Sequence, residues 1–378
     1  MFPTALLTAF LLLVVSVAAN PIVVRKPSVS LSFARHLNIT GSRDLVAKGS
    51  SSGVLSRDGV VSVGVTNVGV AYHATVGVGS PPPTVSDTLL IDTGSSNTWV
   101  GAGKTYVRTN TSVQTSDSTE FTDTVTIGPG LVISGQSIGV ASDSTGFTGF
   151  DGVLGIGPTD RTVGTLSPDT GSSVPTVTDN LFSSGIIESN LVSVNGELTF
   201  GGTDSEKYTG DITFIPITST SPANQFWGID GSIRYGASTS ILSTTAGIVD
   251  TATALFLITT DAFNRYSTAT GAVLDVTTGL LSITSAQFAN LESLFFTTGG
   301  TTFELTANAQ IWPRALNTLI GGTSGKIYLI VNDIGTSSGE GLDFINGCTF
   351  LERFYSVYDT GNNRVGLATT PFTTATTN

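Results

Sequence analysis

The chain has 378 residues, of which 44 are glycine and only 12% are charged, and its formal net charge at pH 7 is −12. An acidic chain of this kind lacks the basic footprint of a nucleic-acid-binding protein, so we expect no nucleic-acid partner. Abundant glycine and sparse charge favour short strands and many turns over long helices.

The first 19 residues are predicted to be a secretory signal peptide. An apolar run from Leu6 to Val17 is followed by the small residues Ala18 and Ala19, as cleavage by a signal peptidase requires. A membrane anchor is the alternative, but the run is shorter than the about 20 apolar residues that cross a bilayer. We therefore expect an extracellular mature protein without a membrane anchor.

Residues 20–60 form a basic segment ahead of an acidic body. They carry six basic residues against two acidic ones, whereas the whole chain has 16 basic and 28 acidic residues. Charge attraction would hold such a segment on the body at neutral pH and release it when carboxylates become protonated. This predicts the propeptide of an acid-activated zymogen, with a disordered basic linker as the alternative.

From Val61 onward, apolar residues alternate with small or polar ones. Period-two runs punctuated by Gly, Pro, Asn and Asp are typical of an all-β protein. The runs are VSVGVTNVGVAYHATVGVG, TDTVTIGPG, GELTFGG, GDITFIPI, TFELTANAQIW, KIYLIVND and FYSVYD. Helical spacing is predicted in VTDNLFSSG, DAFNRYSTATG and SAQFANLESLFF. Neither a phosphate-binding glycine loop nor a zinc pattern occurs in the sequence, so we expect no cofactor and no metal.

An internal repeat organises the chain. The tetrad Asp92–Ser95 (DTGS) is followed by VLGIGP, whose Gly155 lies 63 residues after Asp92. The tetrad Asp250–Thr253 (DTAT) is followed by FINGCTF, whose Gly347 lies 97 residues after Asp250. The repeat predicts two β lobes that share one plan, an N-terminal lobe over 61–208 and a C-terminal lobe over 209–378, with a cleft between them.

The repeated aspartate suggests acid–base chemistry. Two carboxylates held about 3 Å apart cannot both ionise, so they share a proton. One then acts as a base toward a water molecule while the other protonates a carbonyl, which hydrolyses a peptide bond without a metal or a covalent nucleophile. Ser95 and Thr253 can donate hydrogen bonds to the outer carboxylate oxygens.

Triad chemistry is almost excluded by the histidines and the cysteine. His36 lies in the predicted propeptide, which leaves His73 as the one candidate base. Cys348 is the only cysteine, so no internal disulfide can form, and we expect its thiol to be buried and inert rather than nucleophilic.

Four segments together resemble the pepsin-like aspartic peptidases, in particular their secreted fungal type: LLIDTGSSNTWVG, FDGVLGIGP, GIVDTATAL and GLDFINGCTFLERFYSVYDTGNNRVGLA. The resemblance extends from about Val61 to the C-terminus. It implies a bilobal all-β fold, a monomer that hydrolyses polypeptide substrates at acid pH, and Asp92 and Asp250 as the catalytic pair. It also implies supporting or substrate-binding positions at Thr93, Gly94, Ser95, Trp99, Thr251 and Thr253.

Two departures from the family concern the site itself. Ala252 stands where the family has glycine. If this position required positive φ or a close backbone contact, the methyl group would cost about 1–3 kcal/mol or move Asp250. Between Tyr106 and Gly128 no Tyr-Gly pair occurs, although the family has one in the flap hairpin that closes over the substrate. Tyr106 is too near the first tetrad to replace it, and Phe121 is a weak substitute.

Two further departures concern the scaffold. SNLVSVNGELTFGG is shorter than the corresponding family segment, which predicts an exposed sheet edge if a strand is lost. Asn346 stands where the family has an apolar residue. These departures leave two alternatives to an active peptidase: a catalytically impaired relative that binds peptides or a partner, or a chain shortened at misplaced exon boundaries.

Overall fold

A computed structural model describes residues 60–67, 71–81, 86–115, 119–166 and 171–377. The predicted signal peptide, and the predicted propeptide except for Val60, lie outside the described residues. None of the helices within the described ranges is long and apolar enough to cross a membrane.

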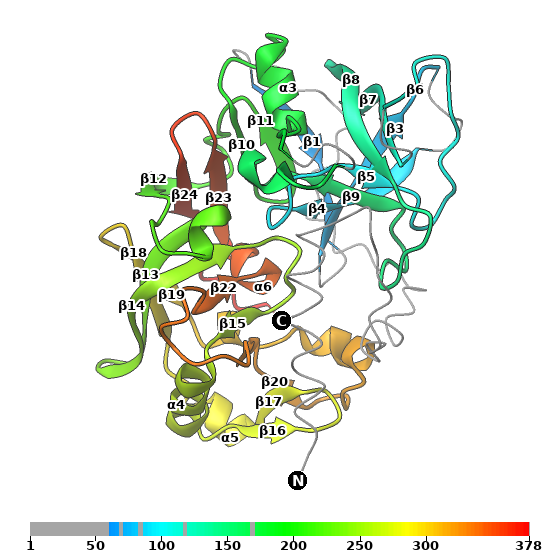
Figure 1. Cartoon of the computed structure of the whole chain (residues 1–378). Coiled ribbons are helices and arrows are strands. Elements are labelled where there is room, and N and C mark those ends of the chain that lie inside the picture. The colour runs from blue at the N-terminus through cyan, green and yellow to red at the C-terminus, as the bar shows by residue number, and fades with distance from the viewer. Residues whose placement is uncertain (1–59, 68–70, 82–85, 116–118, 167–170, 378) are drawn as a thin grey trace. The chain divides into compact units, whose positions relative to one another are not determined.

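The described residues divide into two compact units (Figure 1). The Asp92 unit comprises residues 60–204 and 357–362, and the Asp250 unit comprises residues 205–356 and 363–377. The lobe boundaries expected from the sequence, 61–208 and 209–378, remain a prediction.

The Asp92 unit is built on an eight-stranded sheet in the order β2-β3-β4-β9-β5-β8-β7-β6. Its central strands alternate buried and exposed positions or are buried throughout, as the apolar periodicity of the sequence requires. The strands are β2 (Thr66–Asn67), β3 (Tyr72–Val78), β4 (Asp87–Asp92), β5 (Trp99–Val100), β6 (Val113–Gln114), β7 (Glu120–Gly128), β8 (Leu131–Val140) and β9 (Gly152–Gly155).

A second sheet contains the segment that the sequence analysis expects to be shortened. β10 (Leu191–Val194) and β11 (Glu197–Phe200) are joined by the two-residue turn Asn195-Gly196, in which Gly196 has φ 67°. This is the turn chemistry that a tight hairpin favours. β1 (Val61–Gly64) pairs with the outer side of β11, from Val61 opposite Phe200 to Gly64 opposite Glu197. β11 is therefore not an edge strand, and β1 is the outer strand of this sheet.

The Asp250 unit is built on a seven-stranded sheet in the order β19-β18-β13-β14-β22-β15-β21. A three-stranded sheet, β16-β17-β20, and the pair β12–β24 accompany it. The strands are β12 (Thr209–Pro216), β13 (Gly228–Tyr235), β14 (Thr239–Val249), β15 (Phe256–Ile258), β16 (Val273–Asp275), β17 (Leu280–Ile283), β18 (Leu294–Thr298), β19 (Thr301–Leu305), β20 (Ile327–Tyr328), β21 (Val331–Asp333), β22 (Phe344–Asn346) and β24 (Arg364–Thr369). β23 (Phe354–Asp359) begins in this unit, and its residues from Val357 onward belong to the Asp92 unit.

Helices are short, as the composition predicts. The first two helical predictions are confirmed by α3 (Val177–Ser183) and α4 (Thr260–Thr270), whereas the third is only partly right. α5 (Ser285–Phe288) ends after one turn, and the LFF of that stretch begins β18, which pairs with β13 and β19. Within the described residues, the remaining helices are α6 (Cys348–Leu351), η1 (Thr159–Thr162), η2 (Ala223–Gln225), η3 (Asn308–Gln310) and η4 (Arg314–Ile320).

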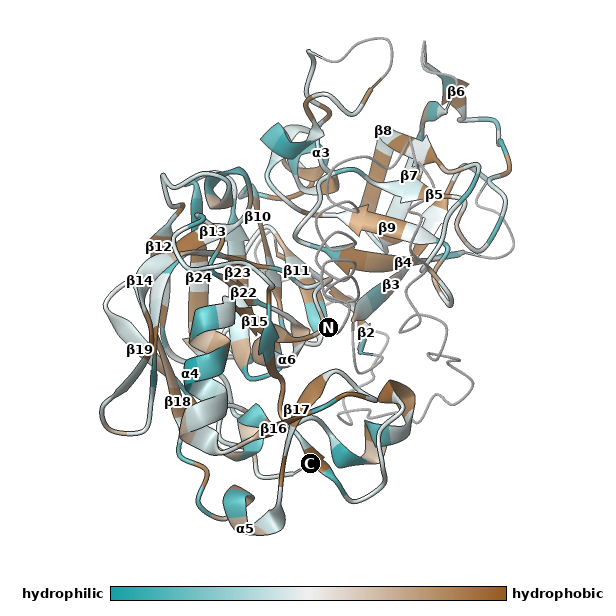
Figure 2. Cartoon of the chain, turned by 60° about the horizontal axis from the view of Figure 1, so that its bottom comes forward, coloured by the Kyte–Doolittle hydropathy of each residue, from teal (hydrophilic) through white to brown (hydrophobic). Residues whose placement is uncertain are grey.

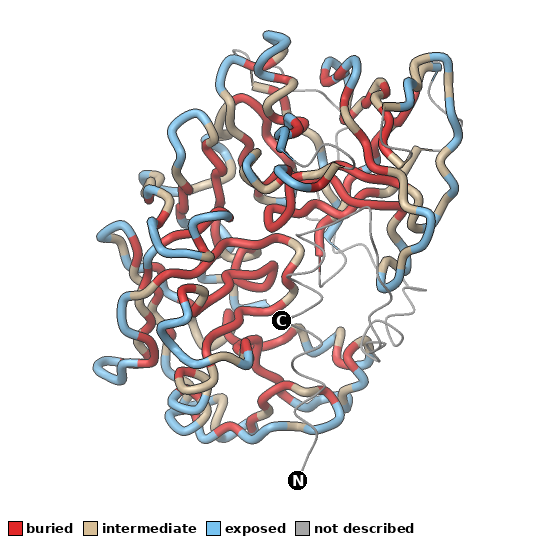
Figure 3. The backbone as a smooth tube through the Cα atoms, in the orientation of Figure 1, coloured by how far each residue is buried: buried red, intermediate tan, exposed pale blue. Residues whose placement is uncertain are grey.

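The core of each unit lies in its large sheet. Figure 2 shows β8 and β9 of the Asp92 unit as largely hydrophobic, and Figure 3 shows burial concentrated along the strands rather than in the connecting loops. In the Asp250 unit, Phe256, Phe296 and Phe350 pack ring against ring with centroids 5.5–6.5 Å apart. Cys348 is fully buried, as expected. The all-β prediction is confirmed, and the glycine-rich turns leave little room for helix.

Asn346 breaks the apolar pattern of this core. It lies on β22 between Val249 of β14 and Phe256 of β15, and its side chain is completely buried. Neither its amide nitrogen nor its amide oxygen has a hydrogen-bond partner among the described residues. The same position in the Asp92 unit, opposite Ile91, is occupied by Leu154. A buried amide without partners carries a desolvation cost that leucine avoids.

Replacing Asn346 by leucine is therefore expected to raise the free energy of unfolding by about 1–3 kcal/mol. Denaturant unfolding of Asn346→Leu and of the unchanged protein measures the difference. Asn346→Asp is the matched comparison, since a buried carboxyl group should destabilise. A loss of stability in Asn346→Leu would show that the amide has partners that the fold requires.

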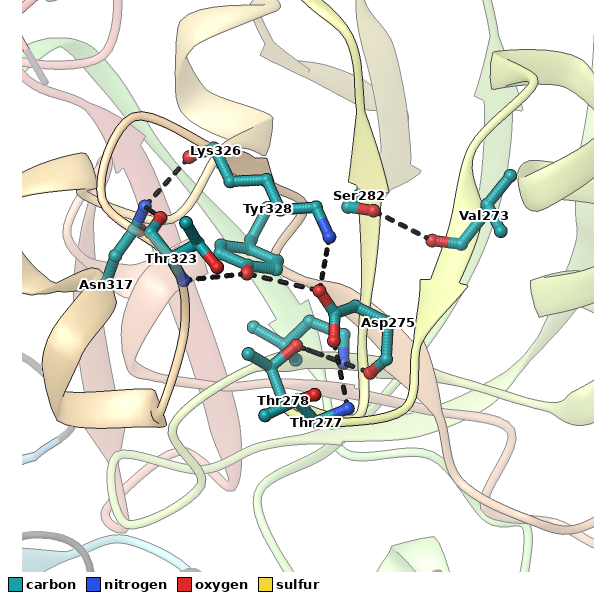
Figure 4. A network of polar contacts seen from close by, with 10 residues as sticks. Val273, Asp275, Thr277, Thr278, Ser282, Asn317, Thr323, Lys326 and Tyr328 are labelled. Carbon is teal, nitrogen blue, oxygen red and sulfur yellow. Dashed lines mark hydrogen bonds and ion pairs between the residues drawn. The ribbon is translucent and has the colours of Figure 1, made fainter.

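A polar network fastens the three-stranded sheet of the Asp250 unit (Figure 4). Asp275, at the end of β16, forms an ion pair with Lys326, which directly precedes β20. The Tyr328 hydroxyl donates to the same carboxylate over 3.2 Å, and the backbone N–H of Thr277 donates over 2.9 Å. The hydrogen bond from Lys326 lowers the pKa of Asp275 to about 2, despite the opposing effect of burial. The pair links the two outer strands across β17.

The network should strengthen the fold at mildly acid pH. Because the folded pKa of Asp275 lies below the unfolded value of about 3.9, its contribution is full above pH 4 and is lost as the pH falls toward 2. We expect Asp275→Asn to lower the melting temperature by about 2–4 °C at pH 5 and by less at pH 2. Melting curves measured between pH 2 and pH 5 test this expected difference in melting temperature. Asp211→Asn, at an exposed position of β12, is the control. A pH-independent difference would contradict the assignment.

Candidate active site

The first aspartate ends a central strand of the Asp92 unit. Asp92 closes β4, which runs parallel to β9 with Asp92 opposite Gly155. The carboxylate oxygen Oδ1 accepts the backbone N–H of Gly94 over 2.7 Å, and Oδ2 accepts the hydroxyl of Ser95. Only 2% of Asp92 is exposed, so these donors compensate for the loss of water around the carboxylate.

The second aspartate has the same local geometry in the Asp250 unit. Asp250 directly follows β14, which runs parallel to β22. Its Oδ1 accepts the backbone N–H of Ala252 over 3.0 Å, and its Oδ2 accepts the hydroxyl of Thr253 over 2.6 Å. Asp250 is also 2% exposed. Each carboxylate is thus held by the N–H two residues later and the hydroxyl three residues later.

A glycine lies beneath each aspartate loop because two backbone segments cross there. A methyl group on Gly155 would collide with the backbone of Ser96 and Asn97, and one on Gly347 would collide with the carbonyl oxygens of Thr253 and Leu255. Only glycine allows so close an approach. The apolar-apolar-Gly elements in the sequence are therefore the floor on which the two aspartate loops rest.

Ala252 fits its loop without backbone strain. Among the described residues, Asn363 is the only non-glycine residue with positive φ, so Ala252 does not adopt the left-handed conformation. Its N–H bonds Asp250 as that of Gly94 bonds Asp92. The cost expected for a methyl group at a position of positive φ does not arise.

The remaining predicted positions are buried. Thr93, Thr251 and Thr253 are fully buried, and Trp99 is 5% exposed. Trp99 pairs with Val153 of β9, and its ring meets the edge of Phe147 at 4.8 Å between centroids. Within its own unit, the structure thus groups Gly94 and Ser95 around Asp92, and Ala252 and Thr253 around Asp250.

The segment that lacks Tyr-Gly forms a short hairpin. Val113 and Gln114 of β6 pair with Thr122 and Phe121 of β7, and residues 116–118 between them lie outside the described residues. Phe121 is itself buried and packs on Tyr106 at 5.2 Å, so it serves the core and does not replace a flap tyrosine.

Tyr106 is also committed to a structural role. Its hydroxyl donates to the Asp123 carboxylate over 2.6 Å, and the hydroxyls of Thr111 and Ser112 donate to the same group. Burial alone would raise the pKa of Asp123, but these hydrogen bonds outweigh it and lower the pKa. The network fastens the loop before β6 to β7.

One charged residue near Asp92 escapes sequence reasoning. Arg161 lies on η1, half-buried, and the Asp92 carboxylate acts on it electrostatically. Burial lowers the pKa of Arg161, and Asp92 opposes that effect. The sequence signal is a single basic residue shortly after VLGIGP, which no repeat or motif distinguishes.

Comparison with known proteins identifies the family. A model described as "Eukaryotic aspartyl protease" matches residues 71–121 and 112–370. The two matches overlap within the β6–β7 segment, where the Tyr-Gly pair is absent.

Individual relatives agree with this match. Polyporopepsin of Irpex lacteus is 65% identical over 340 residues, which cover 84% of this chain and 99% of that protein. Pepsin A of Rhinolophus ferrumequinum is 29% identical over 336 residues, covering 79% and 80%. The crystal structure of an aspartic proteinase from Irpex lacteus, 64% identical, superposes with a TM-score of 0.83 over 84% of this chain and all of that one. The chain therefore belongs to the eukaryotic aspartyl protease family, the pepsin-like aspartic endopeptidases.

Proposed function

We propose that this protein is a secreted endopeptidase that hydrolyses peptide bonds at acid pH through a water molecule activated by Asp92 and Asp250. The observation that carries the proposal is the equivalence of the two half-sites. Asp92 ends β4, which runs parallel to β9, and Asp250 follows β14, which runs parallel to β22. Each carboxylate accepts one backbone N–H and one side-chain hydroxyl. The same hydrogen-bond arrangement around two aspartates suits a reaction that needs two carboxylates.

The hydrogen bonds explain how one group stays ionised in acid. Donors aimed at a carboxylate favour its charged form and lower its pKa. If the two aspartates lie side by side, mutual repulsion raises the second ionisation, so that one proton is shared over an acid pH range. In that range, the ionised carboxylate takes a proton from water and the protonated one donates to the peptide carbonyl. Collapse of the tetrahedral adduct then needs a proton on the departing amine, which the dyad returns.

The charge distribution supports acid activation of the same enzyme. Residues 20–60 are basic and the body is acidic, so carboxylate protonation would weaken their attraction. We propose that residues 1–19 direct export and that residues 20–60 are a propeptide released in acid. Polypeptides are the substrates, as membership of the protease family implies.

Replacing either aspartate should abolish most activity. We expect Asp92→Asn and Asp250→Asn each to lower kcat by about 10²–10⁴-fold, since each removes one partner of the proton relay. The readout is cleavage of a denatured protein from pH 3 to 6 after acid treatment of the full chain. Asp211→Asn removes a carboxylate from the exposed face of β12 and serves as the control.

The pH profile gives an independent check. A shared proton predicts a bell-shaped dependence of kcat/KM on the acid side of neutrality. An optimum near pH 8, or activity that survives both aspartate substitutions, would contradict the dyad. Peptide binding without cleavage by the unchanged chain would favour the non-catalytic alternative.

Ala252 should have little influence on the rate. Because its N–H already bonds Asp250 and its φ is not positive, Ala252→Gly is expected to change kcat/KM by less than about fivefold. Steady-state kinetics on one peptide substrate measures the ratio. A gain of about 100-fold would show instead that the methyl group displaces Asp250 by roughly 1 Å.

A further inference from the structure

The turn before β6 displays one exposed asparagine. The Ser112 N–H donates to the Thr109 carbonyl over 3.3 Å, which closes a β-turn with Asn110 and Thr111 at its two central positions. Asn110 is exposed, and within the described residues its side chain makes no hydrogen bond. Its amide is therefore open to solvent on the surface of the Asp92 unit.

The other three residues of this turn are fixed by their hydroxyl groups. The Thr109 and Thr111 hydroxyls both accept the Ser80 N–H, over 3.0 and 2.9 Å. The Ser112 hydroxyl donates to the Asp123 carboxylate over 2.7 Å and accepts the Thr109 N–H over 2.7 Å. Thr109, Thr111 and Ser112 are each partly buried. The turn is thus held in place without a contribution from the asparagine side chain.

Asn110 is also the first residue of an N-x-Ser/Thr sequon. The chain has two such sequons, Asn38-Ile39-Thr40 and Asn110-Thr111-Ser112, and the first lies outside the described residues. This sequence is the acceptor for N-linked glycosylation, which suits a surface loop of an exported protein. A folded protein can carry a bulky glycan only where the asparagine faces solvent and takes no part in the fold, and the turn meets both conditions.

Apolar surface flanks the turn on both sides. Val107 is 69% exposed and Val113 is 62% exposed, whereas most large apolar side chains of the described residues are buried. Each valine lies three residues from Asn110, and three residues of chain span at most about 11 Å. A glycan of several sugar rings reaches that distance, and its hydroxyl groups would present a polar surface to water in place of the two valines.

We infer that Asn110 is a site of N-linked glycosylation and that its glycan covers Val107 and Val113. This inference rests on the export proposed above, because the modification takes place in the secretory pathway. The donor class is a polyisoprenyl-diphosphate-linked oligosaccharide. The Asn110 amide nitrogen loses one proton and forms a bond to the anomeric carbon of the first sugar, while the bond from that carbon to the diphosphate breaks and the diphosphate departs with the electron pair.

The first test locates the glycan. The full chain is expressed in a eukaryotic secretory host with Asn38→Gln, which leaves Asn110 as the one sequon. Enzymatic release of the glycan in ¹⁸O-labelled water leaves an ¹⁸O-labelled carboxyl group at the modified position, which mass spectrometry of the peptides locates. We expect the label at position 110 and its loss in Asn110→Gln. Ser112→Thr keeps the sequon and should keep the glycan, and Asn264→Gln, at an exposed position of α4 outside any sequon, is the control.

The second test measures what the glycan covers. Asn110→Gln should fold, because the side chain it changes makes no hydrogen bond within the described residues. We expect it to bind more of an apolar fluorescent dye than the glycosylated chain does, and the added changes Val107→Ser and Val113→Ser should reverse the increase. Equal dye binding by the glycosylated chain and Asn110→Gln would contradict the covering role.

A second expression arm separates this inference from the proposed export. In that arm, residues 1–19 are replaced by the signal peptide of a known secreted protein. A glycan at Asn110 in this arm supports the inference even if the unchanged chain stays in the cell, in which case only the proposed export fails. Unmodified Asn110 in folded protein recovered from the medium of either arm overturns the inference, while acid cleavage that depends on Asp92 would still support the peptidase.

Discussion

The structure depends on a close backbone crossing beneath the aspartate loop of each unit. At Gly155 and at Gly347, a strand passes under an aspartate loop at a distance that excludes any side chain. The crossing sets the loop so that the N–H two residues on and the hydroxyl three residues on both face the carboxylate. The proposed catalysis requires two carboxylates that are buried and still accept hydrogen bonds. Both aspartates beside these crossings meet the two requirements.

Much of this could be predicted from the sequence because it rests on local patterns. Period-two apolar runs predicted the strands. The two tetrads, with Gly155 and Gly347 further along the chain, predicted two similar half-sites. The stretch ending in LESLFF was assigned to a helix, since its apolar spacing suits either structure. Pairing with β13 and β19, which are remote in the chain, decides in favour of strand β18.

The features that escaped prediction are those set by non-local contact. A methyl group at Ala252 looked costly while its φ was unknown, and the actual backbone removes that cost. Arg161 carries no motif, and its backbone lies beside the Asp92 loop only because η1 is hydrogen-bonded to residues of that loop. Asn346 could be recognised as unusual, but its complete burial between two apolar strands could not be read from the chain.

The hairpin between β10 and β11 shows how little connecting chain these strands require. Its turn consists of Asn195 and Gly196 alone, yet β10, β11 and β1 remain in register and their inward side chains remain buried. The sheet needs only that the two strands meet in this register, and it places no demand on what connects them. Lengthening this connection would therefore cost only the small entropy of closing a longer loop.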